Sequence, residues 1–381
     1  MPRRLRRPRA LVWTLALALP ACGACVGGSS PVDDAAEPAA PVEEMPADFQ
    51  ASAAWAELEM LAALGPRTPG SDAAEAARRR IRDYLERYGV PVETVDTVAT
   101  PDGLPPVALT HVLARLPGTS ADRFVLVAPY DSGRHEGFDF VGTNDGASGT
   151  AVLLEVARVL ARREFPYTVE IVFLDGEGRL GQGEGDVANS RWWGSRTLAE
   201  TWQQGGRLDD VRLLVSVNRV CDAELAIARD LGSHRNYREE FWRAARRLGE
   251  TESFVPHAGY ESFTSSHAAF RERGLRAVVG LADTAFGGAE APGVYAGTAD
   301  DLPMHCAEES LASVGAVIVD ALDTIAARLA KIDRFSVRPE PTRPSTETAA
   351  AAESGDDAPA DADTSNADSA ETPAAEATPT S

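Results

Sequence analysis

The residues best suited to chemistry are two carboxylates and three histidines that lie in predicted loops. Asp145 stands in an Asn-Asp-Gly turn, and Glu177 stands between two glycines in an Asp-Gly-Glu-Gly segment. The histidines are His135, His267 and His305. Carboxylates and imidazoles act as general bases and as zinc ligands. The sequence therefore offers the residue types of an acid–base or zinc site.

Each of these side chains also has a simple structural interpretation, and the sequence leaves both open. Asp145 has the residue type of a turn former or of the N-cap of the following helix. Glu177 is equally consistent with an exposed carboxylate. His267 fits a packed histidine inside the fold, and His135 and His305 fit surface histidines. Only their positions relative to the secondary structure favour a site.

Short apolar runs alternate with helical patterns along residues 49–335. Nearly continuous apolar runs predict buried strands at 124–128, 169–174, 213–217 and 277–281. Helical spacing predicts helices at 51–64, 72–88, 149–162 and 311–329. This order predicts an α/β fold, namely a three-layer α/β/α sandwich with a mostly parallel central sheet. Functional residues of such sheets lie in loops after the carboxyl ends of the strands.

Those loops carry a characteristic set of motifs in a fixed order. They are Gly-Pro-Arg-Thr-Pro-Gly-Ser (65–71), Ala-Pro-Tyr-Asp-Ser (128–132), Phe-Val-Gly-Thr-Asn-Asp-Gly-Ala-Ser-Gly (140–149), Phe-Leu-Asp-Gly-Glu-Gly (173–178), Trp-Gly-Ser-Arg (193–196) and Tyr-Ala-Gly-Thr-Ala-Asp-Asp (295–301). Together they resemble the co-catalytic zinc exopeptidases, or zinc aminopeptidases, and the related glutaminyl-peptide cyclotransferases, with bacterial glutaminyl cyclases nearest. The resemblance runs from about Ala54 to Leu329.

The resemblance implies roles for the two carboxylates. In that family the aspartate of the Asn-Asp-Gly loop ligates zinc, and Asp145 matches it. The glutamate of the Asp-Gly-Glu segment is the general base, and Glu177 matches it. The other expected ligands and carboxylates are replaced, at Pro129, Gly178, Asn218, Ser266 and Gly297.

These replacements weaken the expected zinc site. Catalytic zinc usually needs three protein ligands and an open position, and glycine and proline offer no side-chain donor. No cofactor is therefore expected, and zinc only if the chain is active. We expect Gly178→Glu with Gly297→His to rebuild a three-ligand set around Asp145.

Three functions follow from this interpretation. The first is a non-catalytic relative, a pseudoenzyme that binds peptide N-termini or proteins of the cell envelope. The second is a divergent zinc-dependent cyclotransferase or aminopeptidase acting on peptide N-termini, with Asp145 joined by ligands from His135, His267, His305 or Asp300. The third is a structural head group of the envelope.

Both ends of the chain have compositions unlike the middle. Residues 1–25 read as a signal peptide, with an arginine-rich start, a short apolar run and the lipobox-like Leu-Pro-Ala-Cys. Cys22 is then the lipidated residue; an ordinary signal peptide cut near Ala24 is the alternative. Residues 26–48 are expected to be a disordered spacer and 336–381 a disordered acidic tail. These features predict an exported, membrane-anchored lipoprotein.

Charge and cysteine content add two further expectations. The formal net charge of −21 over 381 residues argues against nucleic acid as a partner. Besides Cys22 and Cys25, the chain has Cys221 and Cys306. The sequence alone leaves open whether these two form a disulfide.

Overall fold

The structure is a computed structural model that describes residues 48–181, 191–255, 260–288 and 290–335. All of them belong to the compact unit Pro46–Ser381. The predicted signal peptide, Cys22 and the acidic tail lie outside the described residues, as does all but the last residue of the predicted spacer.

The centre of the fold is a six-stranded mixed sheet with the order β1-β2-β4-β3-β5-β8. Its strands are β1 (Val92–Ala99), β2 (Val107–Leu116), β3 (Ser120–Pro129), β4 (Tyr167–Leu174), β5 (Val211–Val217) and β8 (Val278–Leu281). The strands β4, β3, β5 and β8 are parallel, whereas β1 and β2 form an antiparallel edge. The mostly parallel sheet is therefore confirmed. A separate parallel pair joins β6 (Arg229–Asp230) to β7 (Tyr260–Glu261).

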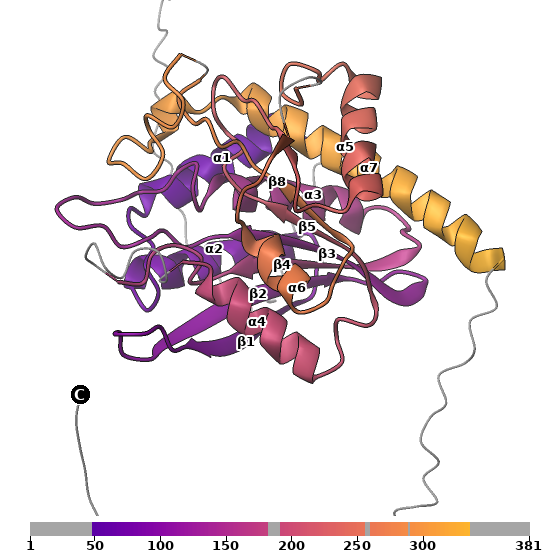
Figure 1. The fold of residues 1–381 in the computed structure, drawn as a ribbon, viewed down its shortest axis with the longest axis horizontal. Coiled ribbons are helices and arrows are strands. Elements are labelled where there is room, and N and C mark those ends of the chain that lie inside the picture. The colour runs from indigo at the N-terminus through magenta and orange to yellow at the C-terminus, as the bar shows by residue number, and fades with distance from the viewer. Residues whose placement is uncertain (1–47, 182–190, 256–259, 289, 336–381) are drawn as a thin grey trace, which may run out of the picture. The chain divides into compact units, whose positions relative to one another are not determined.

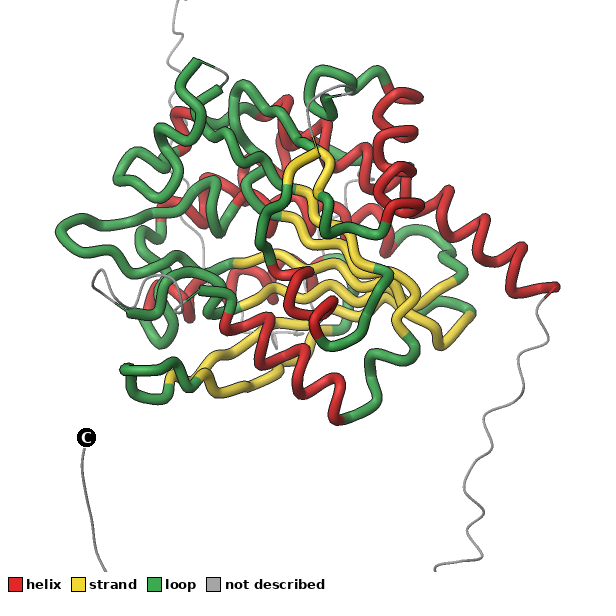
Figure 2. The backbone as a smooth tube through the Cα atoms, in the orientation of Figure 1, coloured by secondary structure: helices red, strands yellow, loops and turns green. Residues whose placement is uncertain are grey.

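Helices cover both faces of the sheet, so the fold has three layers (Figure 1). One face packs against α1 (Ala51–Ala63), α2 (Asp72–Arg87), α3 (Ser148–Ala161), α5 (Arg235–Leu248) and α7 (Glu308–Phe335). The other face packs against α4 (Trp193–Gln204) and α6 (Ser266–Glu272). A short 3-10 helix, η1 (Pro303–His305), precedes α7. The tube view shows how long loops gather at one edge of the sheet (Figure 2).

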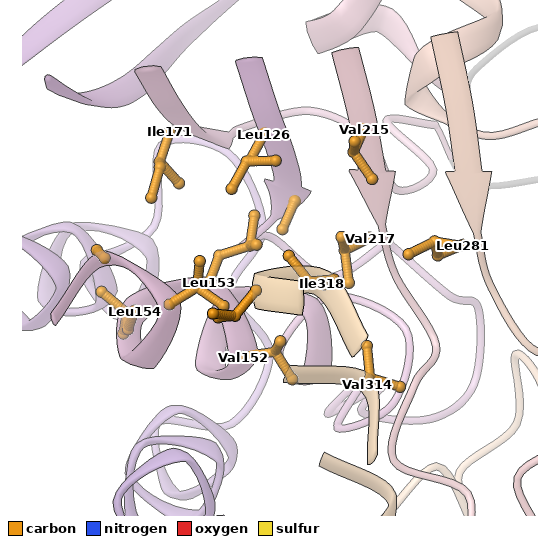
Figure 3. Close-up of a cluster of buried hydrophobic side chains, with 14 of the residues drawn as sticks. Leu126, Val152, Leu153, Leu154, Ile171, Val215, Val217, Leu281, Val314 and Ile318 are labelled. Atoms are coloured by element: carbon orange, nitrogen blue, oxygen red, sulfur yellow. The ribbon is translucent and has the colours of Figure 1, made fainter. Parts of the chain in front are cut away.

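The continuous apolar strands bury both of their faces, as their sequence predicts. In β3, Leu126 points to the core under α3 and α7, while Val125 and Val127 belong to the core under α4 and α6. Figure 3 shows the first core, where Leu126 and Val215 from the sheet face Leu153 of α3 and Ile318 of α7. Successive strand side chains alternate between faces, which explains why these strands carry no polar face.

Helix α7 is the one described helix that is long and apolar enough to cross a membrane. Two thirds of its apolar window, 67%, is buried inside the fold. It packs against α1, α3 and α5. Burial against the protein's own helices explains its composition, so α7 serves here as a core helix.

Several elements escaped prediction from the sequence. The four predicted strands and four predicted helices all appear, with small changes at their ends. The antiparallel strands β1 and β2 were not predicted, and neither were α4, α5 and α6. Ser71 is the N-cap of α2, because its side chain accepts a hydrogen bond from the amide of Ala74. Cys221 and Cys306 form a disulfide that ties the loop after β5 to the segment before α7.

Candidate functional site

Some of the predicted site residues meet at a small cavity beyond the carboxyl ends of β3 and β4. It is lined by Pro129, Asp131, Gly133, His135, Phe140, Asp145, Glu177, Gly178, Arg179, Arg191 and Gly297. Its volume is about 20 Å³, which is room for about one water molecule. The cavity thus contains both predicted carboxylates and three of the five replaced positions.

Asp145 is held by two side chains that take up both of its oxygens. Arg191 Nη2 lies 2.9 Å from Asp145 Oδ2, and Asn218 Nδ2 donates to Oδ1 over 2.8 Å. Burial by itself would raise the pKa of Asp145, but Arg191, Arg219 and the Asn218 hydrogen bond outweigh it and lower that pKa. Asp145 is therefore a charged carboxylate whose neighbours are an arginine and an amide.

The N-cap interpretation of Asp145 is wrong. Helix α3 begins at Ser148, and its N-cap is Ala147, with no side-chain capping bond. The Asp145 carboxylate turns instead toward the cavity and the ion pair with Arg191.

Glu177 is buried and accepts a hydrogen bond at each of its two oxygens, so the exposed-carboxylate interpretation is also wrong. It is only 1% exposed. Its Oε1 accepts from the amide of Ser195 and its Oε2 from the hydroxyl of Ser266, each over 2.5 Å. Burial raises the pKa of Glu177, and the serine hydrogen bonds oppose that rise. Ser266, which replaces a family carboxylate, thus acts as a donor to the candidate base.

The loops around the cavity rest on a frame of three buried charged residues. Arg67 donates to the carbonyl oxygens of Tyr130, Leu61, Gly65, Val141 and Gly142. Asp131 accepts from the amides of Glu177 and Gly178, and Asp301 accepts from those of Asn144 and Asp145. These bonds set the loop conformations that carry Asp145 and Glu177.

Burial shifts the pKa of every member of this frame. Desolvation lowers the pKa of Arg67 to about 10, against the attraction of Asp131 and Asp301. Burial raises the pKa of Asp301 to about 7. It also raises the pKa of Asp131, helped by the nearby Asp175 carboxylate. Buried carboxylates lose hydration and so favour their neutral form.

The three histidines do not converge. His135 lines the cavity and packs on Phe138 and Phe140. His267 is fully buried, and its Nε2 lies 3.1 Å from Asp230 Oδ2, which fits its interpretation as a packed histidine. His305 belongs to η1, and its ring stacks on the ring of Tyr295. Asp300, which precedes η1 in the chain, is exposed. His267, His305 and Asp300 do not line the cavity, so only His135 stands beside Asp145.

The residues present do not fit a zinc ion. Within the described ranges, no three His, Cys, Asp or Glu side chains group as metal ligands would. Asp145 already binds a guanidinium where the family binds its metal. A Cβ atom on Gly178 would lie 2.5 Å from the backbone nitrogen of Gly133. The expectation that Gly178→Glu restores a ligand therefore requires the backbone around Gly133 to shift.

The position of Gly297 is more open but conformationally demanding. A Cβ atom there would meet nothing nearer than His135 Cε1 at 3.9 Å. Its φ of +68° lies in the left-handed region, where a histidine is strained. A histidine at position 297 would therefore have space for its side chain, but the left-handed backbone conformation there would disfavour it.

Three site residues could not be recognised from the sequence. Arg191 forms the ion pair with Asp145, and Arg67 and Asp301 belong to the frame. Arg67 and Asp301 stand in the motifs 65–71 and 295–301, which resemble the family, but the motifs do not reveal the hydrogen bonds that these side chains make. Their partners lie 46 to 157 residues away for Arg191 and Asp301, a separation that local patterns do not reveal.

The comparisons with known proteins agree with this geometry. The model of "Peptidase family M28" matches residues 111–322, more than half of the chain and all of the cavity lining. The chain belongs to peptidase family M28. Asp145 and Glu177 both lie within the matched residues.

Individual relatives include both glutaminyl cyclases and zinc exopeptidases. The structure of the Acidobacteriales bacterium glutaminyl cyclase superposes with a TM-score of 0.67 at 27% identity, covering 76% of this chain and 99% of that one. A Zn-dependent exopeptidase from Parabacteroides distasonis shares the fold, with a TM-score of 0.63 at 20% identity over 72% of this chain and 98% of that one. A Bos taurus glutaminyl-peptide cyclotransferase-like protein is 32% identical over 148 residues, 35% of this chain and 37% of that protein. The chain spans about a third of the curated relatives it matches.

Proposed function

We propose that this chain is a non-catalytic M28 protein that binds peptide ends or another envelope component without zinc. One observation carries the proposal, namely the ion pair between Arg191 and Asp145, closed on its other side by Asn218. A guanidinium at a carboxylate that ligates metal in the family competes directly with a cation. It also leaves the site without the Lewis acid that polarises a carbonyl or activates water.

The state of Glu177 supports the same proposal. Each oxygen of Glu177 accepts one hydrogen bond from the protein, which fixes the carboxylate in place and leaves one lone pair on each oxygen. To act as the family's general base it would need a water or substrate activated by a metal, and the Asp145 carboxylate at the same cavity is paired with Arg191 instead. Glu177 is therefore held in place without an activated partner.

A second candidate is a divergent zinc-dependent cyclotransferase or aminopeptidase. His135 favours it, because this imidazole lines the same cavity as Asp145 and Glu177. For this function Arg191 would have to leave Asp145, so that Asp145 and His135 are free to bind a metal. The displacement of Arg191 separates the two candidates.

Zinc content and turnover test the proposal together. We expect purified protein, with or without added zinc, to retain less than about one tenth of a zinc per chain, because three ligands are lacking. Glutaminyl peptides should show no cyclisation and no release of their N-terminal residue. Zinc in the protein is measured by elemental analysis, and products by mass spectrometry.

The variant Glu177→Gln makes this test specific. Turnover present in the wild type and lost in Glu177→Gln, but kept in the exposed-site control Glu86→Gln, would establish the enzyme and end the proposal. Arg191→Met provides the second arm. If it gains stoichiometric zinc while the wild type has none, Arg191 is the group that excludes the metal.

We further propose that the protein is exported and anchored to a membrane through a lipid on Cys22. The lipobox-like sequence before this residue supports it. Cys22→Ala should move the protein from the detergent phase to the aqueous phase, whereas Cys25→Ala should not. Wild-type protein found in the aqueous phase would contradict the anchor.

A further inference from the structure

Two arginines, Arg179 and Arg191, line the cavity beside His135. The carboxylates Asp131, Asp145 and Glu177 line it as well. Arg191 is paired with Asp145, but Arg179 has no side-chain hydrogen bond or ion pair within the described part of the chain, and its Nε is buried without a partner. The Arg179 guanidinium is therefore free to pair with an anion that enters the cavity.

The cavity's carboxylates do not supply the missing acceptor. Asp131 is bound by the amides of Glu177 and Gly178, and Glu177 by Ser195 and Ser266. Asp145 is occupied by Arg191 and Asn218. Burial and the charges of Arg179 and Arg191 lower the pKa of His135, with Asp145 opposing them. The lowered pKa favours the neutral form of His135.

We propose that the cavity is a carboxylate-binding site in which Arg179 is the main ionic partner, with Arg191 and His135 beside it. The inference rests on the proposed absence of zinc, because a metal would displace Arg191. The ligand is the carboxylate of a peptide C-terminus or of a free small acid. On this proposal the site selects a carboxylate and not the amino group of a peptide N-terminus.

Size and shape favour a carboxylate over larger anions. The cavity of about 20 Å³ accepts one oxygen-sized group at its inner end. A planar guanidinium binds the two oxygens of a carboxylate side by side. A tetrahedral phosphate places further charged oxygens against Pro129 and Phe140, which also line the cavity.

Calorimetry on the full-length, zinc-free protein tests this assignment. The probes are N-acetyl-trialanine with a free carboxylate, the same peptide as its C-terminal amide, acetate and inorganic phosphate. The free acid should bind and the amide should not. Arg179→Gln should weaken the acid about tenfold, the loss of one charge-assisted hydrogen bond, and Arg179→Lys should weaken it less.

Arg87→Gln is the matched control, because Arg87 is exposed on α2 and does not line the cavity. It should leave binding unchanged. Acetate that binds as tightly as the peptide acid would identify a free small acid as the source and still support the site. Tighter binding of phosphate, equal binding of the amide or no effect of Arg179→Gln would overturn it.

The outcome also separates this inference from the proposed function. If the protein is zinc-free and inactive but binds no acid, only the carboxylate site fails. If it holds zinc and turns over glutaminyl peptides, the proposed function fails, and with it the premise of a vacant Arg179.

Discussion

The loops around the cavity differ sharply between their buried side and the side that faces the cavity. On the buried side, Arg67, Asp131 and Asp301 are bound by carbonyl oxygens or amides of those loops. On the cavity side, Pro129, Gly178 and Gly297 offer no side-chain donor. The loops of this M28 fold are therefore held by their own buried hydrogen bonds, and their shape does not require a metal.

The buried side should matter most for stability, and Arg67 should show the largest effect. Arg67→Met removes a fully buried guanidinium and leaves five carbonyl oxygens without this donor. We expect the free energy of unfolding to fall by about 3 to 5 kcal/mol. Urea denaturation measures it.

Arg79→Met is the control for that experiment. Arg79 forms an exposed pair with Glu75 one helical turn away, and its loss should cost less than about 0.5 kcal/mol. Equal effects of the two substitutions would remove the distinction between the buried frame and the surface.

Asp301 should give the second largest effect, visible as a pH dependence. Its pKa of about 7 in the fold exceeds the ordinary 3.8, so the folded state binds this proton more tightly than the unfolded state. The stability contributed by Asp301 is therefore greatest at low pH and is lost as pH rises from about 4 to 7. Asp301→Asn removes that dependence.

Denaturation of wild type and Asp301→Asn at several pH values tests this. Between pH 4 and pH 8, the free energy of unfolding of Asp301→Asn should rise relative to that of the wild type by on the order of 2 to 4 kcal/mol. Asp300→Asn, at the exposed neighbour, should follow the wild type. If Asp301→Asn were instead stabilised relative to the wild type at low pH, the pKa of Asp301 would be lowered in the fold and not raised.

The smallest effects are expected on the cavity side, and they should differ between its two glycines. Gly178→Ala forces a Cβ to 2.5 Å from Gly133 N, which should cost about 1 to 3 kcal/mol. Gly297→Ala meets open space but keeps φ at +68°, which should cost about 1 kcal/mol.

Thermal or urea denaturation of both alanine variants checks that order. Zinc analysis of Gly178→Glu extends the test. Stoichiometric zinc in Gly178→Glu without loss of stability would mean that the loop backbone can accept a ligand there.

The fold was largely predictable because its strands are covered on both faces. Residues 124–128 and 169–174 are apolar without interruption, and burial under two helical layers explains why. The edge strand β1 was missed because it is more exposed and carries polar residues such as Glu93 and Asp96. Strand β2 lies between β1 and β4, and its sequence mixes apolar residues with Thr110, His111 and Arg115. Helices α4 and α5 lack a long apolar run and depend on the sheet for their positions.

The candidate site was predictable only in its carboxylates and replaced ligands. Asp145, Glu177, Pro129, Gly178 and Gly297 do line one cavity. Asn218 and Ser266 sit beside it as hydrogen-bond donors to Asp145 and Glu177. Motif position reveals where a residue stands along a loop, but not which distant side chain its oxygens will meet.

The sequence by itself determined the alternation of strands and helices and the loops on which the M28 motifs stand. It also determined that positions 178 and 297 offer no side-chain donor, since a glycine has none in any fold. The tertiary structure decided what replaced them. Arg191 reaches Asp145 across 46 residues of chain, and Arg67 reaches Gly142 across 75. Such partners depend on how the loops pack in space, so no local pattern of residues predicts them.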